Sequence, residues 1–145
     1  MNSKLLTSLF VGLLIFLIAA CQGADEIKKA QFYTNGKTLY TNNCGNCHGE
    51  KGDGLGKLYP PLSDTTSIAQ KRRQLACIVK YGMHETLNIG QQTFDTEMPG
   101  SPQLSQQEIA YILTYVGNSF GNDLGLISTE EVEASLKNCV AEIQP

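Results

Sequence analysis

The segment NNCGNCHGEKGDG, residues 42–54, constrains this chain more than any other part of its sequence. Cys44, Cys47 and His48 lie within five residues, and three glycines follow them closely. Two thiols and an imidazole at such short spacing are typical of a metal site, a redox-active disulfide or a covalently attached cofactor. The rest of the sequence must distinguish between these three.

Two of these interpretations lack supporting residues. A structural zinc site needs a second pair of Cys or His ligands, but Cys77, Cys139 and His84 are isolated in the sequence. A thioredoxin-like dithiol follows a strand in a βαβ unit. No alternating strand pattern precedes Cys44, and the chain has no Trp. We therefore favour neither zinc nor a dithiol.

Covalent haem attachment explains the spacing itself. Two thiols at i and i+3 can form thioethers with the two vinyl groups of a haem, and the next imidazole then reaches the iron from one face. The glycines fit as well, because backbone close to a flat macrocycle has little room for a Cβ. We expect one covalently bound haem c, attached through Cys44 and Cys47 with His48 as an axial ligand.

The N-terminus predicts export, as haem c requires. Lys4 precedes a nearly continuous apolar run from Leu5 to Ala20, which is typical of a secretory signal. The run is shorter than the roughly 18–20 residues that span a bilayer, which disfavours an uncleaved transmembrane anchor. It ends in LIAAC, which resembles the lipobox of bacterial lipoproteins. We expect residues 1–20 to be a lipoprotein signal peptide, Cys21 to carry the lipid, and residues 21–29 to form a tether.

The remaining sequence predicts a single all-α domain. The chain has 145 residues and a net charge of −3, without a basic run that would indicate a nucleic-acid partner. One helix is expected to run into Cys44, and a second to cover about residues 67–81. Loops rich in Gly and Pro are expected at 49–66 and 88–104. No segment shows a convincing strand alternation.

Two further helices have start signals. Ser105 and Glu108 form a capping box. The apolar stripe after it consists of Ile109, Ile112, Leu113, Val116 and Phe120. Ser128 and Glu131 suggest a second box. The helix after it is marked by Val132, Leu136, Val140 and Ile143.

With these features the sequence resembles the class I, monohaem cytochromes c over roughly residues 30–120. GKTLYTNNCGNCHG is similar to the family's N-terminal helix and haem motif, and IAYIL at 109–113 to the closing helix. The resemblance implies three core helices around the haem, with Gly36 and Tyr40 crossing Tyr111. Residues 121–145 lie beyond the family pattern and are expected to form a helical extension.

The resemblance also implies the remaining haem contacts. YPPL is similar to the loop in which a proline carbonyl orients the haem-binding histidine, with Pro60 the better match and Pro61 the alternative. Met98, fifty residues after His48 and just before the capped helix, corresponds to the second axial ligand. Met83 and His84 remain competitors for that position.

These features predict a carrier of single electrons and not an enzyme, because no nucleophile–base pair or acid–base dyad appears. The expected partners are redox protein donors and acceptors of a respiratory chain and a membrane reached by the lipid, without a small-molecule substrate. The expected location is outside the bacterial cytoplasm, facing the periplasm or the cell exterior. Alternatives are a fixed haem subunit of a larger oxidase or reductase, and an open-site haem protein that binds a gas or peroxide.

The cysteine count predicts one further bond. Of five cysteines, one is assigned to lipid and two to haem, which leaves Cys77 and Cys139 in an oxidising compartment. We expect a disulfide between them, with two buried free thiols as the alternative.

Overall fold

The computed structural model describes residues 3–143, with side chains described for residues 9–12 and 23–139. The chain divides into two compact units, residues 1–31 and 32–145. Helix α1 (Ser3–Asn43) accounts for the described part of the first unit and continues into the second. Within the described residues, no helix is long and apolar enough to cross a bilayer.

The predicted leader and anchor fall largely outside this description. The backbone of residues 21–29 is helical, but the side chain of Cys21 lies outside the described residues. The signal peptide, the lipidation of Cys21 and the tether therefore stay predictions.

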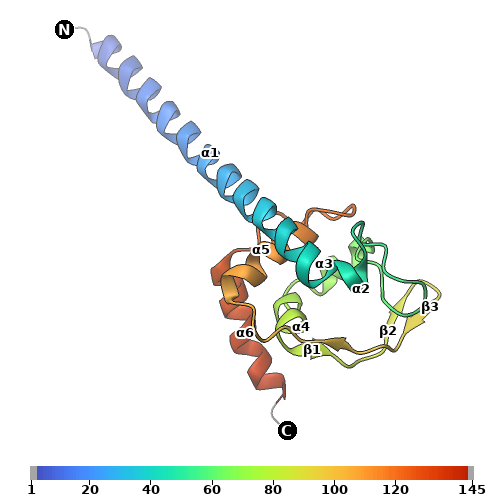
Figure 1. The fold of residues 1–145 in the computed structure, drawn as a ribbon. Helices are drawn as coiled ribbons and strands as arrows, with labels where there is room; N and C mark the ends of the chain where they lie inside the picture. The colour runs from blue at the N-terminus through green and yellow to red at the C-terminus, as the bar shows by residue number, and fades with distance from the viewer. Residues whose placement is uncertain (1–2, 144–145) are drawn as a thin grey trace. The chain divides into compact units, whose positions relative to one another are not determined.

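The second unit is mainly helical, with four very short strands (Figure 1). After α1, its helices are α2 (Gly45–His48), α3 (Thr65–Gln70), α4 (Leu75–Tyr81), α5 (Gln106–Val116) and α6 (Thr129–Ile143). Its strands are β1 (Gly82–Met83), β2 (Leu87–Ile89), β3 (Gln92–Phe94) and β4 (Met98–Pro99).

The strands correct the expectation that the chain has none. They form two antiparallel pairs, β1 with β4 and β2 with β3. β3 and β4 lie within the loop predicted at 88–104, β2 begins one residue before it, and β1 directly follows α4. Segments of two or three residues are too short for an alternation pattern, so their pairing depends on tertiary contacts. Their effect is to fold residues 82–99 back on themselves and bring Met98 close to the end of α4.

The predicted second helix over 67–81 is also wrong as one element. It is two helices, α3 and α4, separated by turns at residues 71–74. The first begins earlier than expected because Asp64 caps it, accepting hydrogen bonds from the backbone N–H groups of Thr66 and Ser67 at 3.2 and 3.3 Å. Gly82 ends the second helix as predicted.

The crossing of α1 and α5 is tight and follows from a glycine. A Cβ on Gly36 would collide with the backbone carbonyl of Tyr111, so only glycine allows the two helices to approach this closely. The rings of Phe32 and Tyr111 pack edge to face on one side, with centroids 4.7 Å apart. On the other side Tyr40, which is almost fully buried, packs against Tyr115. The predicted helix crossing is confirmed.

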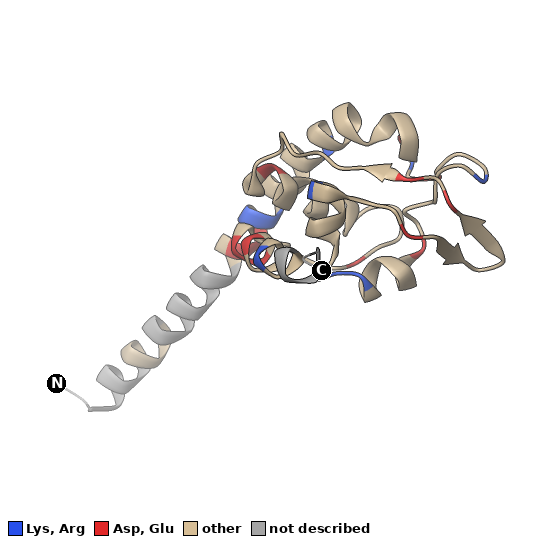
Figure 2. Cartoon of the chain, turned by 90° about the horizontal axis from the view of Figure 1, so that it is seen from below, with Lys and Arg blue, Asp and Glu red and all other residues tan. Residues whose placement is uncertain are grey.

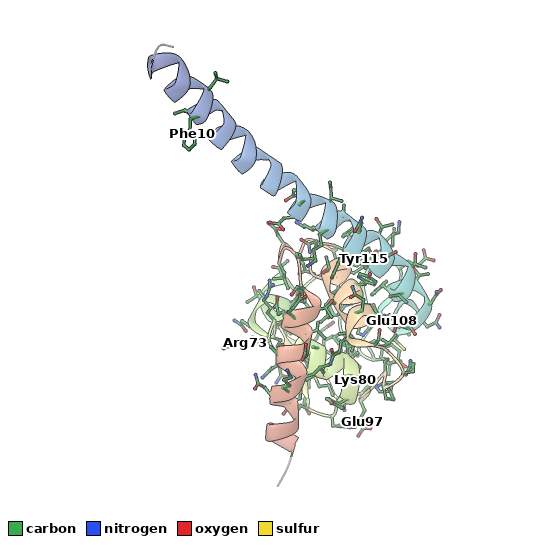
Figure 3. All side chains as sticks on the ribbon, turned by 90° about the vertical axis from the view of Figure 1, so that its left-hand side faces the viewer. Phe10, Arg73, Lys80, Glu97, Glu108 and Tyr115 are labelled. Atoms are coloured by element: carbon green, nitrogen blue, oxygen red, sulfur yellow. A yellow bond between two sulfur atoms is a disulfide. The ribbon has the colours of Figure 1, made fainter. Side chains whose placement is uncertain are left out.

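Helix α5 has the predicted capping box, in which the Glu108 carboxylate accepts from the Ser105 N–H at 2.8 Å. Glu108 is labelled in Figure 3. Its apolar stripe ends earlier than expected. The helix stops at Val116, and Phe120 lies in a turn at a φ of 59°. Its ring still joins the core, 5.5 Å from Tyr40 and 5.7 Å from Tyr115 between centroids.

The C-terminal extension packs on α4 and α5 through the buried side chains of Ile127, Val132 and Leu136. Only half of its predicted capping box is present: Ser128 Oγ accepts from the Glu131 N–H, while the Glu131 carboxylate binds Arg72 in a bidentate pair. The Arg72 guanidinium also donates to the carbonyls of Leu124 and Leu126.

A covalent bond adds to this attachment. Cys77 of α4 and Cys139 of α6 form a disulfide, with Cα atoms 5.9 Å apart. The side chains of Val140 and Ile143, predicted to continue the apolar face of α6, lie outside the described residues. The extension is thus fixed to the domain by packing, one ion-pair cluster and one disulfide.

Candidate functional site

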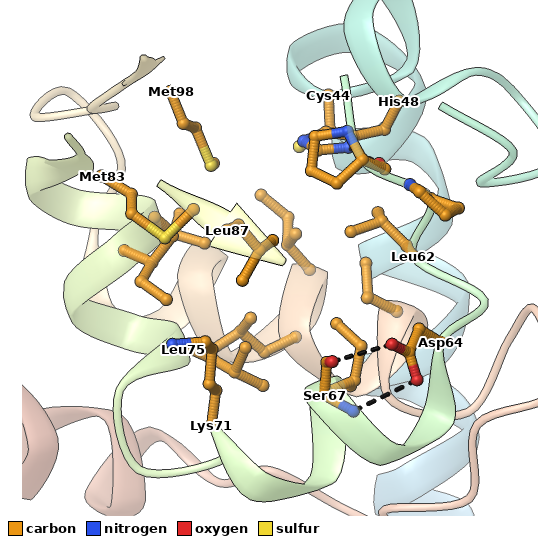
Figure 4. Close-up of a pocket in the computed structure, with 18 of the residues that line it drawn as sticks. Cys44, His48, Leu62, Asp64, Ser67, Lys71, Leu75, Met83, Leu87 and Met98 are labelled. Carbon is orange, nitrogen blue, oxygen red and sulfur yellow. Dashed lines mark hydrogen bonds between the residues drawn. The ribbon is translucent and has the colours of Figure 1, made fainter. Parts of the chain in front are cut away.

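An apolar cavity lies between the C-x-x-C-H turn and the β1–β4 pair (Figure 4). Its walls come from α3, α4, α5 and β2, with Ile68, Leu75, Ile78, Leu87, Ile112 and Leu113 among the lining residues. Lys71 and Asp64 are the charged residues at its lower end in that view. Figure 2 shows basic and acidic residues distributed over several elements of the described chain.

His48 projects into this cavity from the end of α2. Its Nδ1 lies 3.1 Å from the carbonyl oxygen of Pro60, so Nδ1 carries the proton and donates, which leaves Nε2 free to bind a metal. Burial lowers the pKa of His48, and the hydrogen bond to Pro60 partly opposes that shift. The imidazole is therefore held neutral and in one orientation, as a ligand must be.

The position of the Pro60 carbonyl depends on a folded loop that begins at Gly54. The Gly54 N–H donates to the His48 carbonyl at 2.9 Å, and the Leu55 N–H donates to the Tyr59 carbonyl at 3.0 Å. Gly54 has a φ of 70°, and a Cβ there would collide with the carbonyls of Tyr59 and Pro60. Glycine at this position thus allows the loop to close beneath the imidazole. Between the two predicted candidates, Pro60 and not Pro61 makes the contact.

Cys44 and Cys47 are free, partly buried thiols. Cys44 lines this cavity, and Cys47 lines a smaller adjoining cavity that shares His48, Met83 and Met98 with it. Burial raises the pKa of Cys44 to about 11, and the neighbouring Cys47 adds to the shift. Among the residues that the structure describes, no group of three or more His, Cys, Asp or Glu side chains is placed to hold a metal ion. A zinc site therefore gains no support from the geometry.

Two methionines face His48 from the other side. Met98 and Met83 both line the cavity, and Figure 4 places both sulfur-bearing side chains at the end opposite the imidazole. His84, the third candidate for this position, does not line it. Its side chain is 70% exposed and its Nδ1 lies 3.3 Å from Glu97 Oε1.

These residues fit a haem. The thiols lie at one edge, a neutral and oriented imidazole lies on one side, thioethers lie on the other, and apolar walls join them. A flat apolar macrocycle with two vinyl groups and an iron complements each of these features.

The family model for cytochrome c matches residues 33–119, well over half of the chain. The chain belongs to the cytochrome c family. Members of this family are electron carriers with covalently bound haem c, so this cytochrome c transfers electrons and is not an enzyme. The predicted fold class, cofactor and absence of catalysis are thereby confirmed.

Curated relatives agree with this assignment. This cytochrome c is 25% identical over 92 residues to a cytochrome c-552 of Thermus thermophilus, across 61% of this chain and 70% of the relative. A second cytochrome c-552 of the same species has the same identity, and there the match covers 62% of the relative, less than two thirds of its length. The cytochrome c subunit of a quinone alcohol dehydrogenase of Gluconobacter oxydans is 28% identical over 102 residues, which is 68% of this chain but 21% of that subunit.

Sequence reasoning missed several contributors to the site. No sequence motif marks Lys71 or Asp64 as cavity residues. The run D-T-T-S that begins at Asp64 is nevertheless a recognisable helix start. No sequence pattern places Met83 beside Met98, because that proximity arises only from the β1–β4 pairing.

Proposed function

We propose that this chain is a lipid-anchored cytochrome c that carries single electrons outside the cytoplasm. In this proposal Cys44 and Cys47 bind the haem covalently, His48 and Met98 are its axial ligands, and Cys21 carries the lipid. The observation that carries the proposal is the position of His48 and Met98 on opposite sides of one apolar cavity, with Cys44 at its edge and Cys47 in the adjoining cavity that His48 and Met98 also line.

Each of these residues has a defined task. Bound haem supplies one-electron chemistry at its iron. His48 donates Nδ1–H to Pro60 and would therefore offer Nε2 to a haem iron in a fixed orientation. The apolar walls would exclude water from the haem, and a thioether ligand from Met98 would raise its reduction potential relative to a second histidine.

Optical spectroscopy of the purified holoprotein tests the ligand set. The oxidised protein should show the weak near-infrared band of sulfur-to-iron charge transfer, and the haem should stay attached in denaturant. Met98→Leu should move or abolish that band, whereas Met83→Leu should leave it unchanged. A wild-type spectrum without the band would refute His48/Met98 ligation, and so would a band that Met83→Leu abolishes and Met98→Leu leaves unchanged.

Intact mass spectrometry tests the anchor. Membrane-extracted protein should begin at Cys21 and carry the mass of a diacylglyceryl group, and Cys21→Ser should be released into the soluble fraction. A chain cut elsewhere with an unmodified Cys21 would refute the anchor and leave the haem site unaffected.

A fixed haem subunit of a larger complex is the second candidate. It is favoured by the similarity to a cytochrome c subunit of a quinone alcohol dehydrogenase. Purification in mild detergent distinguishes the two: a subunit should elute with a dehydrogenase or oxidase at a constant ratio, while a carrier should elute alone and exchange electrons with a separable partner in a salt-dependent way.

A further inference from the structure

The cavity holds a second thioether that the proposed ligand set does not use. Strands β1 and β4 pair antiparallel, with Met83 directly opposite Met98. Side chains directly opposite each other in such a pair lie on the same face, with Cβ atoms about 4.5–5.5 Å apart. Both methionines are half-buried and line the same cavity as His48.

The backbone keeps these two side chains together. A Cβ on Gly82 would collide with the Met98 carbonyl, and one on Gly100 would lie 2.6 Å from the Tyr81 carbonyl carbon, so the two strands approach each other closely. The segment after β4 is fixed to α4, because the Ser101 N–H donates to the Val79 carbonyl at 2.9 Å. Lys80 Nζ also donates to the carbonyls of Pro102 and Leu104. Met83 is therefore held beside Met98 by backbone contacts that do not involve either methionine side chain.

The chemistry of methionine makes this neighbour a potential ligand. Its unbranched side chain has three rotatable bonds and ends in a soft thioether sulfur, so it can move its sulfur without moving the backbone. The adjacent lining residues Ile78, Val79 and Leu87 have no donor atom. Lys71 also lines the cavity, but Figure 4 places it at the lower end, near Ser67 and Leu75.

We propose that Met83 is a reserve axial ligand, whose sulfur takes the position opposite His48 when Met98 is lost. This inference rests on the proposed function, in which Met98 is the resident ligand. It predicts that His/Met ligation survives loss of Met98 and fails only when both thioethers are removed.

The test uses reduced holoprotein labelled with methyl-¹³C methionine. The methyl group of a methionine bound to iron lies over the haem plane, so ring currents move its NMR resonance far upfield. Wild type, Met83→Leu, Met98→Leu and the double variant are compared, because leucine conserves volume and has no sulfur. Met98→Ala is measured alongside, since it leaves more room for Met83 to reach the iron.

One shifted resonance is expected in wild type, at the same position in Met83→Leu. In Met98→Leu or Met98→Ala a shifted resonance should reappear at a new position, and the double variant should have none. The proposal is overturned if both Met98 variants lack a shifted methyl resonance, whether the iron becomes high-spin or stays low-spin with a nitrogen ligand such as Lys71. A different pattern, in which Met98→Leu leaves the wild-type resonance in place and Met83→Leu moves it, would instead refute Met98 as the resident ligand.

Discussion

The disulfide between Cys77 and Cys139 offers a quantitative test of how the C-terminal extension is held. The bond closes a loop with a sequence separation of 62 residues. For a loop of that length, the chain-entropy model gives a stabilisation of about 4 kcal/mol at 25 °C, an upper value since engineered and native bridges often deliver less. We therefore expect reduction to lower the free energy of unfolding by about 2–4 kcal/mol.

The reduced protein should nevertheless keep α6 docked. Ile127, Val132 and Leu136 stay buried without the bridge, and Arg72 still binds Glu131. Reduction of the disulfide should thus leave the helical circular dichroism unchanged under native conditions, and also the haem spectrum when it is compared in one oxidation state of the iron. The loss of stability should appear only in the denaturant midpoint.

The assay is urea unfolding of the holoprotein with and without a phosphine reductant, which does not cleave thioethers. The matched variant is Cys77→Ser/Cys139→Ser, in which the hydroxyl at position 139 has the Ser135 carbonyl nearby, since the native Cys139 sulfur lies 3.2 Å from that oxygen. The variant should match reduced wild type and should not respond to reductant. Two alkylatable thiols in the unreduced, denatured protein, or an unchanged midpoint on reduction, would refute the reasoning.

Three further predictions concern single residues. Gly36→Ala should destabilise the protein by about 1–3 kcal/mol in urea unfolding, because the new methyl meets the rigid carbonyl of Tyr111, whereas Gly23→Ala, with nothing within 4 Å, should cost nothing. Gly54→Ala should displace the Pro60 carbonyl from His48, and the haem reduction potential should rise because the imidazole becomes less basic. Gly56→Ala is the control, since Gly56 also has a positive φ but open space around it, and its potential should not change. Equal reduction potentials in the two variants would contradict this role of Gly54. The hydrogen bonds from Ser105 lower the pKa of Glu108 below its unfolded value. The contribution of Glu108 to stability is therefore present above about pH 4 and is lost as the pH falls through the folded pKa. Glu108→Gln should make the free energy of unfolding less dependent on pH in that range.

The local features could be predicted from the sequence because short sequence patterns determine them. The capping box of Ser105 and Glu108 needs only two side chains three residues apart, and the covalent motif needs only Cys44, Cys47 and His48 in one helical turn. The helix crossing at Gly36 was predicted through the family resemblance, and steric contact with Tyr111 accounts for it.

Other features could not be predicted from the sequence because the residues that determine them lie far apart along the chain. The break between α3 and α4 coincides with Arg72, whose guanidinium reaches Glu131, 59 residues further along the chain. The same contact diverts Glu131 from the capping box that its spacing with Ser128 predicted. The strands were missed for a similar reason, since segments of two or three residues have no periodicity of their own.

By itself, then, the sequence determined the chemistry: two thiols, an imidazole and the residues that begin and end the main helices are all local in the chain. Only the tertiary structure decided which groups face one another across the cavity. In it the carbonyl of Pro60, and not that of Pro61, contacts His48, and His84 lies at the surface beside Glu97. It also paired Met83 with Met98, because backbone contacts between segments separated along the chain set that register.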